Sequence, residues 1–352
     1  MATGLASLVE NGTKVWSDSV DPDVIERDLP RGITGATSNP VIVADLINTG
    51  RFDQTMRKQL EHTAEDHELA WQMTDQLVQD AQQTFSPIWE QTGGNDGYVS
   101  FELDPLLEDP ELGPTHERVV AQYIDLGKQW SAGQTNRLIK VPATAAGLEA
   151  LEELAAASVP LNVTLVFTQR QYEAAREAIW KGMQRAGNHQ HYKSVYSIFI
   201  SRLDVYTQKH VPELSEAAQG WVGTVNAKRL WRLNQDYWRD KGVGLDQEIV
   251  FASTGTKLAS DPPDKYVEAL VGSDIQTNPP QTNQAVEDLG KRYSRTIDQM
   301  PDVAVLEEID EKVDMAELER VLMQEGVKKF ADPQKSLLKV IEKKRASLIT
   351  TG

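Results

Sequence analysis

Residues 137–144 read Arg137-Leu138-Ile139-Lys140-Val141-Pro142-Ala143-Thr144, which places one lysine inside a short apolar run. The run has the length and composition of a buried strand. A lysine is seldom fully buried without a partner, and burial favours the neutral amine, which is the form that attacks carbonyl groups. Lys140 is therefore the first candidate for covalent chemistry. A lysine at a strand end that extends its ammonium group into solvent explains the same residues equally well.

A helical pattern follows this run directly, and a second apolar run comes after it. We predict the helix over residues 146–157 and the second strand over residues 159–167. A strand, a helix and a strand within about thirty residues form a parallel βαβ unit. Lys140 then lies on one of two neighbouring parallel strands.

The same alternation runs through most of the chain. Eight strands are predicted, and helical patterns follow them. Eight strand–helix pairs in strict alternation favour an α/β fold, a (β/α)8 TIM barrel, over an open doubly wound sheet. With the short loops into which some of them run, the strands are expected at residues 14–18, 33–40, 98–103, 137–144, 159–167, 194–202, 248–257 and 274–277.

Additional helices are expected in two places. Residues 51–89 are predicted to form an insertion outside the sheet, between the second and third strands. Residues 315–325 and 334–348 are predicted as two terminal helices on the outside. We predict a single domain over residues 1–352, with the barrel at about 14–300 and a C-terminal helical extension at about 301–352.

Composition limits the class of protein. The chain has 352 residues, of which 40% are apolar, and a formal net charge of −17. This charge disfavours non-specific binding to nucleic acid or to an anionic membrane surface. The absence of cysteine excludes disulfides, thiolate nucleophiles and thiolate metal sites. The first residues lack the pattern of a secretory signal, and no stretch approaches the roughly 20 apolar residues of a membrane span, so we expect a cytoplasmic protein.

Polar residues interrupt the apolar alternation inside several strands. Asn162 and Thr164, for example, alternate with apolar residues, so one face of their strand is polar. A barrel interior is normally filled with branched apolar side chains, so polar groups pointing inward from several strands indicate a site at the barrel's mouth. A single inward polar side chain can be explained by a buried hydrogen bond that satisfies it. That explanation is poor for polar side chains on several strands at once. The inward candidates are Asp18, Asn39, Glu102, Lys140, Asn162, Thr164 and Ser197.

Seven short motifs surround these residues. They lie at residues 15–18 (VWSD), 37–40 (TSNP), 99–102 (VSFE), 138–144 (LIKVPAT), 162–167 (NVTLVF), 197–202 (SIFISR) and 252–257 (ASTGTK). No single motif identifies a family, but seven motifs that occur in the same order as in one family are a specific sign of it. From Val15 to about Pro280 the chain resembles the transaldolases, Schiff-base enzymes of the pentose phosphate pathway, and in particular their longer bacterial and plant branch.

The resemblance implies transfer of a three-carbon dihydroxyacetone unit, with neither cofactor nor metal. The implied donor is sedoheptulose 7-phosphate or fructose 6-phosphate, and the acceptor is glyceraldehyde 3-phosphate or erythrose 4-phosphate. Lys140 is the implied nucleophile, because its Schiff base with the C2 carbonyl permits cleavage of the C3–C4 bond. The resemblance makes Asp18 the base for the C4 hydroxyl. Glu102, through a water held by Thr164, is the expected acid–base group for dehydration of the carbinolamine.

The resemblance also implies a binding site for the sugar and its phosphate. Arg202, at the end of the sixth strand, can offer a bidentate guanidinium to the phosphate, and Ser253 a hydroxyl. Lys257 is expected as a second cation, although other branches place an arginine in this loop. Two asparagines are expected to bind the hydroxyl groups of the donor. The full set of expected substrate-binding residues is Asn39, Asn162, Ser197, Phe199, Arg202, Ser253 and Lys257.

Three other interpretations stay open. The related fructose 6-phosphate aldolases release the three-carbon unit, but they typically carry a glutamine where Glu102 stands and a tyrosine where Phe199 stands. A metal-dependent aldolase is disfavoured because the six histidines are scattered. A catalytically silent barrel is disfavoured because nothing visible disables the site. As partners we expect phosphorylated sugars, without nucleic acid or membrane, and a monomer or homodimer.

Overall fold

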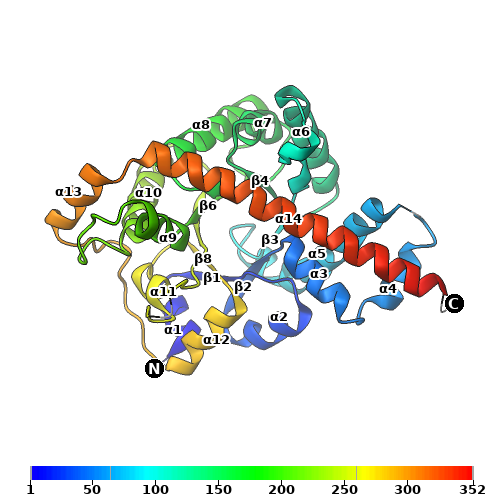
Figure 1. The fold of residues 1–352 in the computed structure, drawn as a ribbon, viewed down its shortest axis with the longest axis horizontal. Coiled ribbons are helices and arrows are strands. Elements are labelled where there is room, and N and C mark those ends of the chain that lie inside the picture. Colours follow the sequence, from blue (N-terminus) through cyan, green and yellow to red (C-terminus); the bar gives the residue numbers. More distant parts are fainter. Residues whose placement is uncertain (1, 64, 259, 351–352) are drawn as a thin grey trace.

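Eight parallel strands form a closed barrel in the computed structural model, which describes residues 2–63, 65–258 and 260–350. Each strand pairs with the next one along the chain, and the last pairs with the first (Figure 1). The predicted (β/α)8 barrel is therefore confirmed. The strands are β1 (Lys14–Ser17), β2 (Ile33–Thr37), β3 (Val99–Glu102), β4 (Arg137–Pro142), β5 (Leu161–Val166), β6 (Ser194–Phe199), β7 (Glu248–Ala252) and β8 (Ile275–Asn278).

Helices surround the barrel. They are α1 (Gly4–Glu10), α2 (Pro22–Asp28), η1 (Leu29–Arg31), α3 (Pro40–Asn48), α6 (His116–Ser131), α7 (Ala145–Ala156), α8 (Gln169–Ala186), α9 (Ser201–His210), α10 (Val222–Trp238), α11 (Lys265–Ala269) and α12 (Pro280–Leu289). The start of α7 follows from its local sequence. The Thr144 side chain accepts a hydrogen bond from Gly147 N–H and caps this helix. A methyl group at Gly147 would lie 1.9 Å from the carbonyl oxygen of Pro142, so the tight turn after β4 requires glycine.

The insertion between β2 and β3 contains α4 (Asp53–Gln59) and α5 (Asp66–Gln91), and β3 is followed by the short helices η2 (Pro105–Glu108) and η3 (Pro110–Leu112). A buried arginine at the start of β4 fastens α5 to the barrel. Arg137 forms an ion pair of 2.7 Å with Asp75 and bonds twice to Gln82 Oε1, at 3.0 and 2.9 Å. Its guanidinium also lies 4.9 Å from the ring centre of Phe101.

The C-terminal region differs from the prediction of two separate outer helices. After the short α13 (Val303–Lys312), α14 (Met315–Thr350) is one helix that runs through Pro333. A proline inside a helix removes a hydrogen bond and often marks an end, but here α14 packs against α3, α5, η2 and α9 on both sides of it. Figure 1 shows α14 crossing the face of the molecule in front of the barrel strands.

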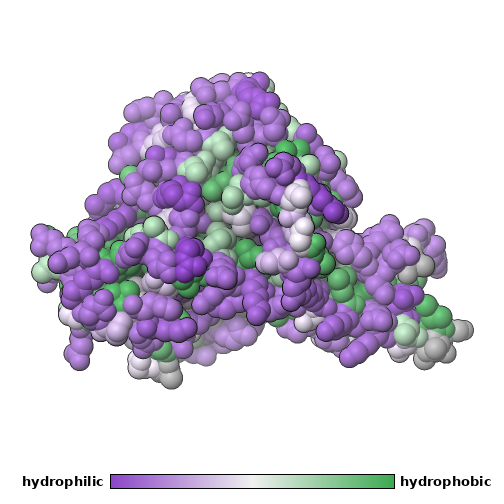
Figure 2. Space-filling model, turned by 45° about the horizontal axis from the view of Figure 1, so that its top comes forward, coloured by the Kyte–Doolittle hydropathy of each residue, from purple (hydrophilic) through white to green (hydrophobic). Residues whose placement is uncertain are grey.

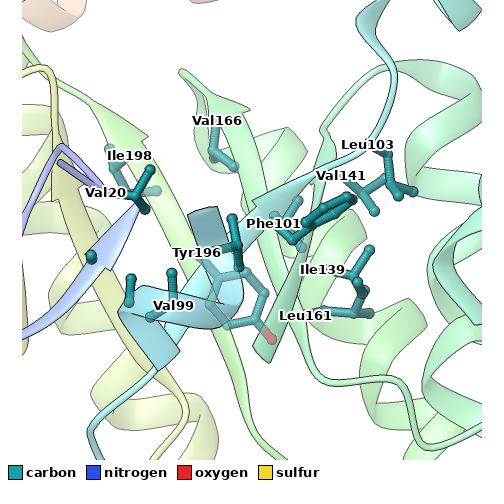
Figure 3. Packing of buried hydrophobic residues seen from close by; sticks show 14 of the residues in the cluster. Val20, Val99, Phe101, Leu103, Ile139, Val141, Leu161, Val166, Tyr196 and Ile198 are labelled. Carbon is teal, nitrogen blue, oxygen red and sulfur yellow. The ribbon is translucent and has the colours of Figure 1, made fainter. Parts of the chain in front are cut away.

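The barrel interior changes from apolar to polar along the strands. A cluster that includes Trp16, Leu138 and Val195 fills its lower part. Two positions further along β4 and β6, the same faces carry Lys140 and Ser197. The opposite strand faces pack against the helices, and Figure 3 shows residues of this core, including Phe101, Ile139 and Val141. The polar groups therefore gather at the carboxyl ends of the strands.

The sixth strand ends earlier than predicted. β6 stops at Phe199, and α9 begins at Ser201. Arg202 therefore lies in the first turn of a helix and not at the end of a strand. The apolar pattern of residues 194–202 gave no sign of this boundary, because short apolar runs fit a buried strand or a buried helix turn alike.

The alternation of β5 also breaks at its end. Leu165 and Phe167 stand where strict alternation would continue the face of Val163, but Leu165 adopts a left-handed backbone with φ of 55°. This conformation is strained for a residue with a side chain. Leu165 and Phe167 consequently join a second apolar cluster, which contains Leu318 of α14.

The surface is mostly polar. The face in Figure 2 is dominated by hydrophilic residues, with hydrophobic ones in smaller patches. Among the residues that the structure describes, no helix combines the length and apolar character needed to cross a membrane.

Candidate active site

A cavity of about 630 Å³ opens at the carboxyl ends of the barrel strands. This is the end at which TIM-barrel enzymes place their catalytic residues. The structure brings nine of the eleven predicted site residues to its lining: Asp18, Asn39, Lys140, Thr164, Ser197, Phe199, Arg202, Ser253 and Lys257. The other two, Glu102 and Asn162, lie directly behind this lining and bond to it.

Lys140 is buried and paired with one carboxylate. Its Nζ lies 2.8 Å from Oε2 of Glu102, and only 9% of the lysine side chain is exposed. The pair follows from register, because Glu102 on β3 and Lys140 on β4 are directly opposite each other. Burial raises the pKa of the Glu102 carboxyl, and the charge of Lys140 opposes that rise. The carboxylate is thus well suited to accept a proton from the lysine ammonium group.

Two buried oxygen atoms near this pair have no partner. Glu102 lines a small cavity that shares Thr164 and Phe330 with the main one. Within the described residues, Oε1 of Glu102 and Oγ1 of Thr164 are both buried without a hydrogen bond. Buried polar groups are normally paired. Both residues line the same small cavity, which suits a polar molecule no larger than water.

Asp18 is held at the cavity by neighbouring strands. Its Oδ1 accepts a hydrogen bond of 2.7 Å from the Thr37 hydroxyl, which lies 3.3 Å from the Thr277 hydroxyl. Its backbone N–H donates to the carbonyl oxygen of Asn278 at 2.9 Å. Groups from β1, β2 and β8 thereby fix the carboxylate. Thr37 had no predicted role, although it stands in one of the seven motifs.

The two predicted asparagines occupy different positions. Oδ1 of Asn39 accepts from the N–H groups of Val41 and Ile42 and caps α3, which leaves its amide group to donate. Asn162 is fully buried; its Nδ2 donates to Ser100 Oγ at 2.9 Å, and its Oδ1 accepts from Ser197 Oγ at 2.7 Å. The structure therefore places Asn39 in the cavity and Asn162 beneath Ser197.

Cationic side chains gather on another part of the lining. The Arg202 guanidinium lies 4.7 Å from the ring centre of Phe199, and its buried Nη1 has no hydrogen-bond partner among the described residues. Ser253, beside it, has a left-handed φ of 57°, and its Oγ is 2.8 Å from that of Ser201. Removal from water, and then the charge of Arg202, lower the pKa of Lys257. An unpaired guanidinium beside a second cation is suited to an oxyanion.

Three residues of α14 also line the cavity, and the sequence predicted none of them. They are Lys329, Phe330 and Pro333. The ring centre of Phe330 lies 5.5 Å from Nζ of Lys140. Only the path of α14 across the barrel brings them there, so no local pattern signals their role.

Metal-ligand clusters are absent from the part of the chain that the structure describes: no three His, Cys, Asp or Glu side chains there are placed to hold an ion. The charged groups around the cavity are instead lysines, arginine and separate carboxylates. These groups suit acid–base and covalent chemistry.

Comparison with known proteins identifies the family. The model of the family described as Transaldolase/Fructose-6-phosphate aldolase matches residues 15–341. The chain belongs to the transaldolase/fructose-6-phosphate aldolase family. The resemblance seen in the seven motifs is thus confirmed, and the match extends beyond Pro280 through most of α14.

Individual members of the transaldolase/fructose-6-phosphate aldolase family match over nearly the whole chain. A "Transaldolase" from Parafrankia sp. is 31% identical over 99% of both chains. A "Transaldolase" from Mycolicibacterium paratuberculosis is 30% identical, and "Transaldolase 2" from Streptomyces avermitilis is 29% identical, each over 97% of both chains. The protein is therefore an enzyme of the transaldolase and aldolase type.

Proposed function

We propose that the protein is a transaldolase of the pentose phosphate pathway. It transfers dihydroxyacetone from sedoheptulose 7-phosphate or fructose 6-phosphate to glyceraldehyde 3-phosphate or erythrose 4-phosphate, through a Schiff base on Lys140. The observation that carries this proposal is the buried amine of Lys140, 2.8 Å from Glu102, in a cavity that is also lined by Arg202, whose Nη1 has no partner among the described residues.

The first step needs an unprotonated amine. The Lys140 ammonium gives its proton to Glu102, whose pKa burial raises, and the amine then adds to the C2 carbonyl of the ketose. Loss of water from the carbinolamine leaves the protonated Schiff base. We assign the proton transfer in this dehydration to Glu102, with a water molecule between its Oε1 and Thr164, because both oxygen atoms lack another partner among the described residues.

Cleavage needs a base for the C4 hydroxyl. Asp18 takes this proton as the C3–C4 bond breaks, and the electron pair of that bond moves into the Schiff base to form an enamine. Thr37 holds the carboxylate in place. Asn39 donates to a hydroxyl of the donor, whereas Asn162 orients Ser197 toward the sugar. The same steps in reverse join the enamine to the acceptor aldehyde.

Transfer rather than simple cleavage requires that the bound enamine stays unprotonated. The aromatic residues nearest the reacting centre support this. Phe330 lies over Lys140, and Phe199 lies against Phe167 and Arg202. Neither ring carries a hydroxyl that donates a proton, and both limit the access of water. We therefore favour the transferase over an aldolase that releases the three-carbon unit.

Reductive trapping tests the Schiff base. Purified protein is treated with borohydride in the presence of fructose 6-phosphate, and the labelled peptide is mapped by mass spectrometry. Lys140 is expected to carry the adduct, and Lys140→Ala is expected to lose both the adduct and turnover while it keeps its circular-dichroism spectrum. Lys257→Ala is the matched control, because it removes another lysine of the same cavity and should still be trapped on Lys140. An adduct on any other lysine would show the assignment to be wrong.

Product analysis separates the two activities of the family. With fructose 6-phosphate and erythrose 4-phosphate together, a transaldolase forms sedoheptulose 7-phosphate and glyceraldehyde 3-phosphate. Release of dihydroxyacetone from fructose 6-phosphate alone, at the same rate, would identify an aldolase instead. The proposal includes a cytoplasmic location and a monomer or homodimer, with phosphorylated sugars as the partners. Size-exclusion chromatography with light scattering measures the oligomeric state.

A further inference from the structure

One turn of α14 lies over the cationic part of the cavity. Lys329 lines the same cavity as Arg202 and Lys257. Its Nζ lies 2.7 Å from Oε2 of Glu325, one turn earlier on the helix. Both side chains of this pair are about half exposed, at 56% and 42%, so the pair is easily rearranged.

A glycine brings this turn close to Arg202. Gly326 stands inside the long helix α14, where glycine costs about 1 kcal/mol relative to alanine. A methyl group at this position would lie 3.2 and 3.3 Å from the two Cδ atoms of Leu165 and 3.8 Å from Nη1 of Arg202. The missing side chain therefore lets α14 approach Nη1 of Arg202, which is buried without a hydrogen-bond partner among the described residues.

Several cationic side chains come together in this region. Burial lowers the pKa of Arg202, and nearby carboxylates oppose this. Among them Glu325 has the largest effect on the pKa, ahead of Glu102 and Asp18. The hydrogen bond from Lys329 is the largest cause that lowers the pKa of Glu325, and the charge of Arg202 lowers it as well. Three cations, at positions 202, 257 and 329, thus line one cavity, and of the carboxylates that act on Arg202 only Glu325 belongs to α14. Like charges that gather in this way disfavour the empty site and favour a bound oxyanion.

We propose that Lys329 is a third cationic ligand for the phosphate of the sugar substrate, and that Glu325 is its partner only while the phosphate is absent. When the phosphate binds between Arg202 and Lys257, Lys329 exchanges Glu325 for the phosphate. The inference rests on the proposed function in taking the anion to be a sugar phosphate. The helix that covers Lys140 through Phe330 then also recognises the far end of the substrate, so it discriminates phosphorylated from unphosphorylated sugars.

Binding of inorganic phosphate tests this proposal without catalysis. Isothermal titration calorimetry at fixed, low ionic strength gives the phosphate Kd of the wild type and of single variants. Lys329→Gln is expected to weaken binding about fivefold, as for the loss of one partly exposed charged contact. Glu325→Gln is expected to tighten it by a similar factor, because the competing carboxylate is gone. Lys328→Gln is the matched control, since it makes the same change of net charge at an exposed neighbour that does not line the cavity.

The outcomes separate this inference from the proposed function. Equal Kd values for Lys329→Gln and Lys328→Gln would overturn it, and so would a Glu325→Gln variant that binds phosphate no more tightly than the wild type. A wild type that binds no phosphate would overturn it as well. The titration is repeated on Lys140→Ala, which cannot form a Schiff base. A phosphate site that depends on Lys329 in that variant supports the inference whatever the trapping experiment shows.

Discussion

Asp274 is expected to make the protein less stable as the pH rises from about 4 to about 6. This residue directly precedes β8 and is buried. Its Oδ1 accepts from Trp231 and Gln235 at 3.2 and 3.0 Å, and its Oδ2 accepts from the N–H of Ile249 at 2.8 Å. Burial, and then the negative charge of Glu248, raise the pKa of Asp274 to about 6, although hydrogen bonds from Ser273, Ile249 and Trp231 oppose the rise.

The size of the effect follows from proton binding in the two states. In the unfolded chain an aspartate loses its proton near pH 3.9, whereas in the native protein Asp274 keeps it to about pH 6. Between these values the native state binds more protons, so the free energy of unfolding falls as the pH rises. A difference of about 2 pH units corresponds to about 3 kcal/mol. This stability is present below pH 3.9 and is lost by the time the pH has passed 6.

The variant Asp274→Asn removes the carboxyl group that titrates and keeps a side chain of nearly the same shape. Urea denaturation from pH 4 to 7.5 gives the free energy of unfolding of both proteins, and the difference, wild type minus variant, is expected to fall by about 2 kcal/mol across this range. The amide NH2 of the variant side chain cannot accept the hydrogen bond from Ile249 N–H, and this lowers the stability of the variant by a constant amount. Because the amount does not change with pH, it does not affect the pH dependence of the difference. Asp240→Asn, at an exposed position, is the control. A difference for Asp274→Asn that stays constant with pH would refute the reasoning.

Two further outcomes are expected. Asp18→Asn should still be trapped by borohydride on Lys140, but its kcat for transfer should fall by roughly 100-fold or more, because the base for the C4 hydroxyl is lost; an unchanged kcat would remove Asp18 from the chemistry. Arg137→Met should lower the free energy of unfolding by about 3 kcal/mol in urea denaturation, because it leaves Asp75 and Gln82 without their buried partner. A loss no greater than that of exposed Arg239→Met would show that Arg137 does not fasten α5.

The sequence was informative wherever structure follows from local pattern. Short apolar runs between helical patterns located all eight strands, and Lys140 and Ser197 lie on the inner faces of theirs, as predicted. Parallel strands of one barrel end at the same edge, so strand-end residues that are far apart in the chain, such as Asp18 and Lys257, line the same cavity. The resemblance to the transaldolases then predicted a chemical role for each of these residues.

The remainder depended on packing that no local pattern records. Pro333 suggested a break, but contacts with the barrel helices keep α14 continuous. Leu165 has a left-handed backbone, and its side chain packs with α14 near Gly326. For the same reason, Phe330 and Lys329 were not predicted at the site. Their place is set by the course of a helix that starts on one side of the barrel and ends on the other (Figure 1).

The position of α14 along the chain has a consequence for biosynthesis. All eight strands precede it, so a nascent chain can close its barrel while this helix is still inside the ribosome. At that stage the amine of Lys140 has no aromatic cover and meets water and cellular aldehydes directly. A released chain that ends at residue 312 is therefore expected to react faster at Lys140 with an amine-directed label than the chain of 352 residues does.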